Sequence, residues 1–231
     1  MGPCYDQSGE IHVTALPDAC YRMRVTSAME GRTIEAVMST RNDLHTVPDG
    51  LPVPVDDGAC DHLAGMALPS VELNSTDGDK VDLANLPGRT IVYIYPRTGR
   101  PDLPPSAEWD AIPGARGCTP QSCGFRDHYQ ELRSLGARVF GLSTQTTEYQ
   151  REAAGRLHLP FPLLSDSDLA FTRALRLPTF DFEPYGSESA VHLQRMALVI
   201  RDGRIEKVFY PVFPPDRNAA DVLAWLTNAT N

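Results

Sequence analysis

Two cysteines five positions apart, Cys118 and Cys123, lie in the segment IPGARGCTPQSCGFRD. Cys118 comes directly before Thr119 and Pro120, and proline favours the first turn of a helix. The first backbone N–H groups of a helix lack partners and its macrodipole is positive there, so this position stabilises a thiolate, the nucleophilic form of cysteine. The sequence therefore predicts a reactive thiolate at Cys118, with Arg116 as the candidate cation beside it.

The spacing of the two cysteines constrains what they can do together. If both are helical, five residues turn the chain by about 500°, which places the side chains on different faces. A disulfide needs Cα atoms about 4.4–6.8 Å apart, so a bond between Cys118 and Cys123 would require the first helical turn to unwind. Such local opening is among the cheaper excursions of a protein. The alternative is that both are small buried residues, as free cysteines often are.

The remaining cysteines are Cys4, Cys20 and Cys60, which makes an odd total of five. No C-x-x-C occurs, and His128 is the only histidine near the Cys118 segment, so the ligand spacing of a zinc site is missing. We predict no bound metal. Cys60 is either a site for mixed disulfides or incidental, and Cys4 and Cys20 are interpreted as incidental.

Composition narrows the class of protein. The chain has 231 residues, of which 42% are hydrophobic, and this is enough for one domain with a full core. A formal net charge of −9 argues against a surface for nucleic acid or anionic membranes. Apolar runs stop at about five residues, whereas a bilayer-spanning helix needs about 20. The N-terminus lacks the apolar stretch of a signal peptide, so we expect a cytoplasmic protein.

The chain divides into a weakly patterned part and a strongly patterned part. Residues 1–60 predict a poorly structured N-terminal extension, and residues 61–231 predict the folded domain. We further expect that residues 1–37 are dispensable, as an upstream mis-started reading frame would be, because Met38 opens a natural polar leader.

The folded part alternates strand and helix patterns. Alternating or continuous apolar runs predict the strands, and 3.6-residue periodicity predicts the helices. In chain order the elements are a hairpin around Asp77-Gly78, a strand at 90–95, a Pro/Gly-rich loop at 97–117, a helix at 119–135, a strand at 137–143, a helix at 147–157, a strand in PFPLLSD, a short helix at 169–175, a hairpin turning at Asp202-Gly203 and a last helix capped by Asp216. This order predicts an α/β fold with a mixed central sheet flanked by helices.

The run GCTPQSCGFRDHYQEL resembles the Q-type, or bacterioferritin-comigratory, peroxiredoxins, whose usual run is TPGCTxEACxFRD. The resemblance extends over about residues 68–226 and implies a thioredoxin fold. It also implies that Cys118 is the peroxidatic cysteine, that Cys123 resolves it as a disulfide, and that Arg195 in RMALVIRD is the active-site arginine. A thiol-dependent peroxidase of hydrogen peroxide and organic hydroperoxides follows, recycled by thioredoxin or a similar reductant, without a cofactor, as a monomer or weak dimer.

Two departures from the family pattern concern the site itself. The family's threonine, three residues before the peroxidatic cysteine, is Ala115 here, and Arg116 replaces a proline. We expect the charge of Arg116 to substitute in part for the missing hydroxyl, with Thr98 as a weaker candidate. The inserted loop carries Trp109 and Ile112, which we expect to line a substrate-selecting lid, or else simply to form a surface insertion.

Two other functions stay open from the residues. One is a thiol–disulfide exchange or redox-sensing module with weak peroxide turnover, which the loss of the hydroxyl at Ala115 favours. The other is a degenerate thioredoxin-fold binding domain, which the retention of Cys118, Cys123 and Arg195 disfavours. His128 and Tyr129 are interpreted as packing or solvent-facing residues.

Overall fold

The computed structural model describes residues 22–26, 33–37, 44–103, 105–183 and 190–230. Its contacts divide the chain into two units, Met1–Asn42 and Asp43–Asn231. In the first unit, β1 (Arg22–Thr26) and β2 (Thr33–Val37) pair as an antiparallel hairpin. Residues 1–21 and Met38 lie outside the described residues. The domain boundary at residue 60 and the dispensability of residues 1–37 stay predictions.

The second unit is built on a mixed seven-stranded sheet. Its strands lie in the order β11-β10-β5-β6-β7-β3-β4, and β5, β6 and β7 are parallel while the other neighbours are antiparallel. A separate small hairpin pairs β8 with β9. The strands are β3 (Glu72–Ser75), β4 (Lys80–Asp82), β5 (Arg89–Ile94), β6 (Ala137–Ser143), β7 (Leu163–Ser165), β8 (Thr179–Asp181), β9 (Val191–Leu193), β10 (Met196–Arg201) and β11 (Arg204–Phe209).

The helices follow the strands much as their periodicity predicts. The α-helices are α1 (Ala107–Asp110), α2 (Cys118–Asp127), α3 (Tyr129–Ser134), α4 (Thr147–Arg156), α5 (Ala170–Leu175) and α6 (Asn218–Thr230). Among the described residues, the short 3-10 helices are η2 (Asp61–Leu63), η3 (Leu83–Asn85) and η4 (Pro215–Arg217).

The sheet separates two hydrophobic cores. All six residues of β5 are buried, as expected for a central strand with both faces covered. Ile91 and Tyr93 pack in one core, and Val92 and Ile94 pack in the other, because successive strand residues point to opposite faces. The predicted α/β fold with a mixed central sheet is confirmed.

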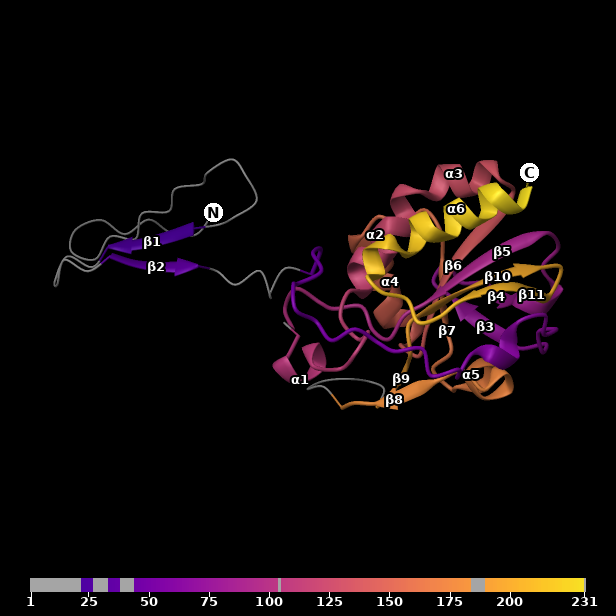
Figure 1. Cartoon of the computed structure of the whole chain (residues 1–231), viewed down its shortest axis with the longest axis horizontal. Helices are drawn as coiled ribbons and strands as arrows, with labels where there is room; N and C mark the ends of the chain where they lie inside the picture. Colours follow the sequence, from indigo (N-terminus) through magenta and orange to yellow (C-terminus); the bar gives the residue numbers. More distant parts are fainter. Residues whose placement is uncertain (1–21, 27–32, 38–43, 104, 184–189, 231) are drawn as a thin grey trace. The chain divides into compact units, whose positions relative to one another are not determined.

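Different helices cover the two faces of the sheet. Phe125 of α2, Leu132 of α3 and Leu226 of α6 fill one core, and Figure 1 shows these three helices together on one side of the sheet. Phe171 and Leu175 of α5 fill the other core, near the β8–β9 hairpin. The packing of these helices on the sheet thereby fixes the end of β5, the start of β10 and the start of α2.

Two local predictions were wrong, and some short elements were missed. The helix expected at 119–135 begins at Cys118 and is interrupted at His128, whose φ of −91° and ψ of 7° leave helical geometry. Asp216 does not cap the last helix, because Pro215 opens a 3-10 turn that contains Asp216, and α6 begins at Asn218. The β8–β9 hairpin and α1 were missed, since these elements are three or four residues long and carry little periodicity.

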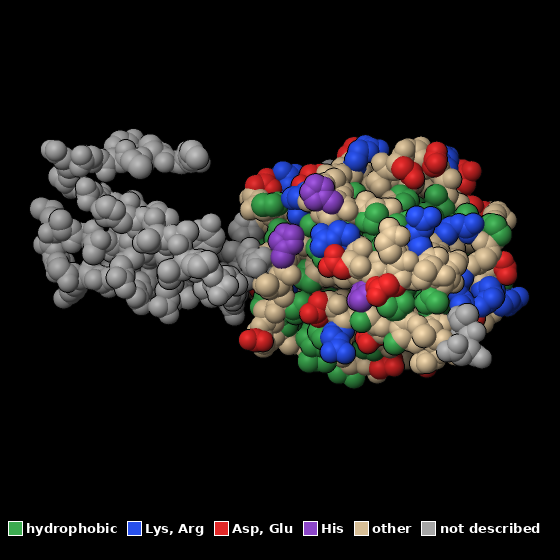
Figure 2. Space-filling view, turned by 90° about the horizontal axis from the view of Figure 1, so that it is seen from above, with side chains coloured by type: hydrophobic (Ala, Val, Ile, Leu, Met, Phe, Trp, Pro, Cys, Tyr) green, Lys and Arg blue, Asp and Glu red, His purple; other side chains and the backbone are tan. Residues whose placement is uncertain are grey.

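The surface carries both signs of charge. On the face shown in Figure 2, basic and acidic side chains are interspersed over the second unit. Within the described part of the chain, no helix combines the length and the apolar character needed to cross a bilayer.

Candidate functional site

Cys118 is the first residue of α2, as the Thr-Pro pair predicts, and only 3% of it is exposed. The preceding Gly117 has φ +102°, a conformation that side chains rarely adopt. A Cβ at Gly117 would also lie 2.3 Å from Cγ of Pro215. Glycine is therefore required here, and its close contact with the η4 turn fixes where the helix, and with it the sulfur, begins.

Two donors point at the sulfur of Cys118. Nη2 of Arg195 lies 3.1 Å from Sγ, and the backbone N–H of Arg97 donates to Sγ at 3.4 Å. Arg97 belongs to the segment that follows β5, and Arg195 directly precedes β10, so the sheet brings both to the start of α2. The arrangement places a permanent positive charge and a backbone amide where negative charge on sulfur would be stabilised.

The Arg195 guanidinium is held by acceptors on every side. Nε donates to the carbonyl of Gly114 at 3.1 Å, and Nη2 donates to the carbonyls of Ala115 and Arg116, both at 3.1 Å. Nη1 donates to Oε1 of Gln121. None of these groups is a carboxylate, and no ion pair to Arg195 occurs among the described residues. Besides these neutral acceptors, the Arg195 guanidinium contacts the sulfur of Cys118.

Gln121 and Asn218 complete this arrangement. Nε2 of Gln121 donates to Oδ1 of Asn218, at the start of α6, at 2.9 Å, and both side chains are at most 1% exposed. Since Oε1 of Gln121 accepts from Arg195, the amide links the C-terminal helix to the guanidinium. Sequence reasoning missed both residues. Gln121 carried a signal, three residues after Cys118 on the same helix, but Asn218 carried none.

Arg116 is buried, with 5% exposed, and its Nη1 lies 3.5 Å from Oδ1 of Asp110 in α1. Part of its charge is therefore offset by a carboxylate. Its backbone carbonyl accepts from Arg195, and its side chain lines the cavity described below. The expectation that Arg116 acts as a cation beside Cys118 stays a prediction.

Cys123 lies on the same helix as Cys118, and both are free thiols. Burial raises the pKa of the half-buried Cys123 thiol above its ordinary value, although nearby Arg126 opposes this. Because both cysteines are helical here, their side chains are about 500° apart around the axis. A disulfide between them needs the helix to open, as expected from their spacing.

Thr98, the weaker of the two predicted replacements for a hydroxyl, does not donate to the sulfur. Ala115 is fully buried, and its carbonyl lies 3.6 Å from Sγ. Oγ1 of Thr98 donates instead to Oε1 of Gln145 at 3.1 Å, so Thr98 is used elsewhere. Within the part of the chain that the structure describes, the donors to Sγ are Arg195 and the Arg97 amide.

A cavity of about 380 Å³ opens at Cys118. Its apolar walls come from Leu44, Leu103, Pro105, Trp109 and Phe182. Of the two residues of the inserted loop that were expected to face the substrate, Trp109 lines the cavity and Ile112 does not. Phe182, which follows β8, was missed because nothing in its local sequence points to the site.

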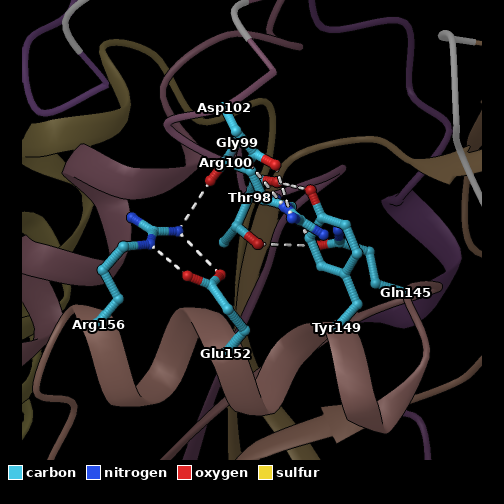
Figure 3. Close-up of polar contacts among 8 residues, drawn as sticks. All are labelled: Thr98, Gly99, Arg100, Asp102, Gln145, Tyr149, Glu152 and Arg156. Carbon is cyan, nitrogen blue, oxygen red and sulfur yellow. Dashed lines mark hydrogen bonds and ion pairs between the residues drawn. The ribbon is translucent and has the colours of Figure 1, made fainter.

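The start of the inserted loop is anchored to α4, as Figure 3 shows. The Tyr149 hydroxyl donates to the carbonyl of Thr98 at 3.0 Å, and Nη2 of Arg156 donates to the carbonyl of Gly99 at 2.9 Å. Glu152 holds the Arg156 guanidinium at 2.7 Å. These contacts keep the segment with the Arg97 amide and Gly99 in place beside the sulfur.

The other candidate residues lie away from the site. Cys60 is buried in the core that contains Val92 and Ile94, and burial together with the neighbouring Asp57 raises the pKa of its thiol to about 12. His128 pairs with Glu131 at 2.6 Å on the exposed side of α3, and Tyr129 packs on Phe161. No cluster of three or more potential metal ligands occurs in the described ranges.

Comparisons with known proteins agree with this geometry. The Redoxin family model matches residues 63–223. Peroxiredoxin Bcp of Escherichia coli (strain K12) is 32% identical over 170 residues, covering 71% of this chain and 94% of the relative. Peroxiredoxin Q of Gentiana triflora chloroplasts is 26% identical over 166 residues, covering 71% of this chain and 67% of the relative.

A solved structure shares the fold. The peroxidoxin BcpB from Mycobacterium tuberculosis superposes with a TM-score of 0.55 at 24% identity, covering 71% of this chain and 96% of that chain. With the family model matching well over half of the chain, and a relative above 30% identity covered almost in full, the assignment is direct. The chain belongs to the peroxiredoxins, in the Q-type or Bcp-like group, and is a thiol-dependent peroxidase with a thioredoxin fold.

Proposed function

We propose that Cys118 is the peroxidatic cysteine, that Cys123 resolves it, and that Arg195 stabilises the reacting charges. The observation that carries this proposal is the sulfur at the start of α2, with the Arg195 guanidinium 3.1 Å away and no competing carboxylate among the described residues. A buried charge-assisted hydrogen bond of this kind is stronger than a neutral one.

The first step is attack of the Cys118 thiolate on the hydroxyl oxygen of a hydroperoxide, ROOH. The S–O bond forms, the O–O bond breaks, and the alkoxide that leaves takes a proton from water to become ROH. Negative charge moves from sulfur to the leaving oxygen during this step, so fixed donors at this position lower the barrier. Arg195 and the Arg97 amide are the donors that the site offers.

The second step is condensation of the Cys118 sulfenic acid with Cys123. The S–S bond forms and water leaves, which protects the sulfur from irreversible oxidation. Because burial raises the pKa of the Cys123 thiol, it is a poor nucleophile while α2 is intact. Opening of the first turns of α2 would both bring the sulfurs together and expose Cys123. A dithiol reductant such as thioredoxin would then reduce the bond by exchange, which suits a reducing compartment such as the cytoplasm.

A second candidate is a redox sensor with weak peroxide turnover. The observation that favours it is Ala115, whose side chain has no hydroxyl to donate to the sulfur; the atom that it brings near Sγ is its backbone carbonyl, at 3.6 Å. Removal of one donor to a developing charge costs about 10²–10³ in rate when nothing replaces it. The Arg97 amide and the Arg195 fork are the groups that would compensate.

One assay tests both candidates. Hydroperoxide consumption is measured with a thioredoxin couple for the wild type, Cys118→Ser and Cys123→Ser, with Cys60→Ala as the matched control. A peroxidase loses all turnover with Cys118→Ser, stops after one equivalent with Cys123→Ser, and is unchanged with Cys60→Ala. Intact mass after one equivalent of peroxide shows a loss of two hydrogens in the wild type. Full turnover by Cys118→Ser would end the proposal.

A further inference from the structure

Trp109 lines the cavity at Cys118 and is buried rather than exposed on the surface. Only 7% of it is exposed, and its ring contacts those of Phe180, Phe182 and His192 at centroid distances of 5.9, 5.3 and 5.2 Å. The Ser106 hydroxyl caps α1 by accepting a hydrogen bond from the backbone N–H of Trp109 at 3.2 Å. The backbone of Trp109 and its indole ring are therefore both held in place, so that binding of a ligand would not have to order this side chain.

The cavity is much larger than hydrogen peroxide needs. Its volume of about 380 Å³ lies within the range of small-molecule sites, about 300–1,000 Å³. A water molecule occupies about 30 Å³ in the liquid, and hydrogen peroxide has only two heavy atoms. The peroxide group needs only the part of the cavity at Cys118. The remaining volume, which apolar side chains line together with Arg97, Glu108, Arg116 and Glu183, is available to a substituent.

The walls on either side of the sulfur come from separate elements. Trp109 is supplied by α1, Phe182 by the segment after β8, and Leu103 by the loop after β5. The loop after β5 is fastened to α4 through the contacts of Thr98 and Gly99 seen in Figure 3. The part of the cavity near Gly99 is thus held in place, and the buried Trp109 ring offers an entering apolar group a packed aromatic surface.

We propose that Trp109 is a specificity-determining residue that selects hydroperoxides with a bulky apolar substituent, such as an aryl or branched alkyl group, over hydrogen peroxide. The substituent lies against Trp109, Leu103 and Phe182 while the peroxide group meets Cys118. This inference rests on the proposed function of Cys118. The inference concerns binding of the organic substituent of the hydroperoxide, which takes no part in the reaction.

The kinetic test compares cumene hydroperoxide with hydrogen peroxide in the wild type, Trp109→Ala and Trp225→Ala. Trp225 is the other tryptophan of the chain and lies on α6, where it stacks with Arg89 rather than lining the cavity. Trp109→Ala should raise KM for cumene hydroperoxide about tenfold or more, as expected for a lost apolar contact, and change the hydrogen peroxide rate less than threefold. Equal effects on both peroxides, or none on cumene hydroperoxide, would overturn the inference.

A binding measurement separates this inference from the proposed function. Cys118→Ser/Trp225→Phe retains Trp109 as the only tryptophan, and its fluorescence is titrated with 2-phenyl-2-propanol, the alcohol product of cumene hydroperoxide. Saturable quenching is expected, and Cys118→Ser/Trp109→Phe should show none. Absence of quenching in the first variant contradicts the role of Trp109 whatever the activity results. Retained turnover by Cys118→Ser contradicts the proposed function instead.

Discussion

Arg195 is the residue whose replacement tests the chemistry of the site most directly. Its Nη2 lies 3.1 Å from Sγ of Cys118, and the side chains are both about 3% exposed. A hydrogen bond to a charged group contributes about 1.5–3 kcal/mol. At about 1.4 kcal/mol per tenfold change in rate, this corresponds to roughly 10- to 150-fold. We therefore expect Arg195→Met to slow oxidation of Cys118 by about 100-fold.

Two further variants separate the charge from the shape of the side chain. Arg195→Lys keeps the charge but loses the fork that serves Gly114, Ala115 and Gln121, so a smaller loss of about tenfold is expected. Arg201→Met is the matched control, because Arg201 ends β10, the strand that Arg195 precedes, but pairs with Glu206 on the surface. This control should stay within twofold of the wild type.

The assay measures the rate constant of the first oxidation step by stopped flow, and in parallel the rate at which Cys118 is alkylated by iodoacetamide. Both rates depend on the thiolate, but only oxidation develops charge on a leaving oxygen. Arg195→Met also leaves buried carbonyls without a donor, at about 1–3 kcal/mol each. Circular dichroism and thermal unfolding must therefore show a native fold. A folded Arg195→Met that is oxidised within threefold of the wild-type rate would refute the reasoning.

Two further predictions concern the scaffold around the site. Gly117→Ala should lower the free energy of unfolding by about 1–3 kcal/mol, because the added Cβ lies 2.3 Å from Cγ of Pro215 and the backbone has φ +102°. Gly155→Ala on α4, where the new Cβ meets nothing within 4 Å, should instead raise the free energy of unfolding by about 0.5–1 kcal/mol. Equal losses of stability for the two variants in thermal unfolding would contradict this prediction. Burial lowers the pKa of His192 below 6.5 in the fold, so the unfolded chain binds the proton more readily and the free energy of unfolding falls as the pH drops through about 6.5. His192→Gln should lose part of that slope, at most about 1.4 kcal/mol per pH unit, in urea unfolding at pH 5–8, and an unchanged slope would contradict the assignment.

Much of the fold could be predicted because its signals are local. The run from Ile91 to Ile94 is β-branched and aromatic and forms the central strand, buried on both faces. Pro120 in the first turn marked the start of α2, and the helix begins at Cys118. Short elements such as β8 and α1 were missed because three or four residues carry too little pattern, and tertiary contacts rather than propensity stabilise them.

The residues of the site divide in the same way. Position in a helix is a local property, so Cys118 at the start of α2 followed from its neighbours in the chain. Arg195 was indicated by the family resemblance, because nothing in its own strand distinguishes it from a surface arginine. Arg116 was chosen for its nearness in sequence, yet the structure pairs its guanidinium with Asp110. Its role as a cation beside Cys118 stays a prediction, because nearness along the chain alone does not fix where a side chain points.

The sequence by itself determined the order of the longer strands and helices, the start of α2 and the family, since backbone preference and apolar periodicity act over a few residues. Only the tertiary structure decided what surrounds the sulfur. The Arg97 amide reaches Cys118 across 21 positions, and Asn218 reaches Gln121 across 97. Such contacts depend on how the sheet orders its strands and how α6 packs on α2, and no local pattern encodes that geometry.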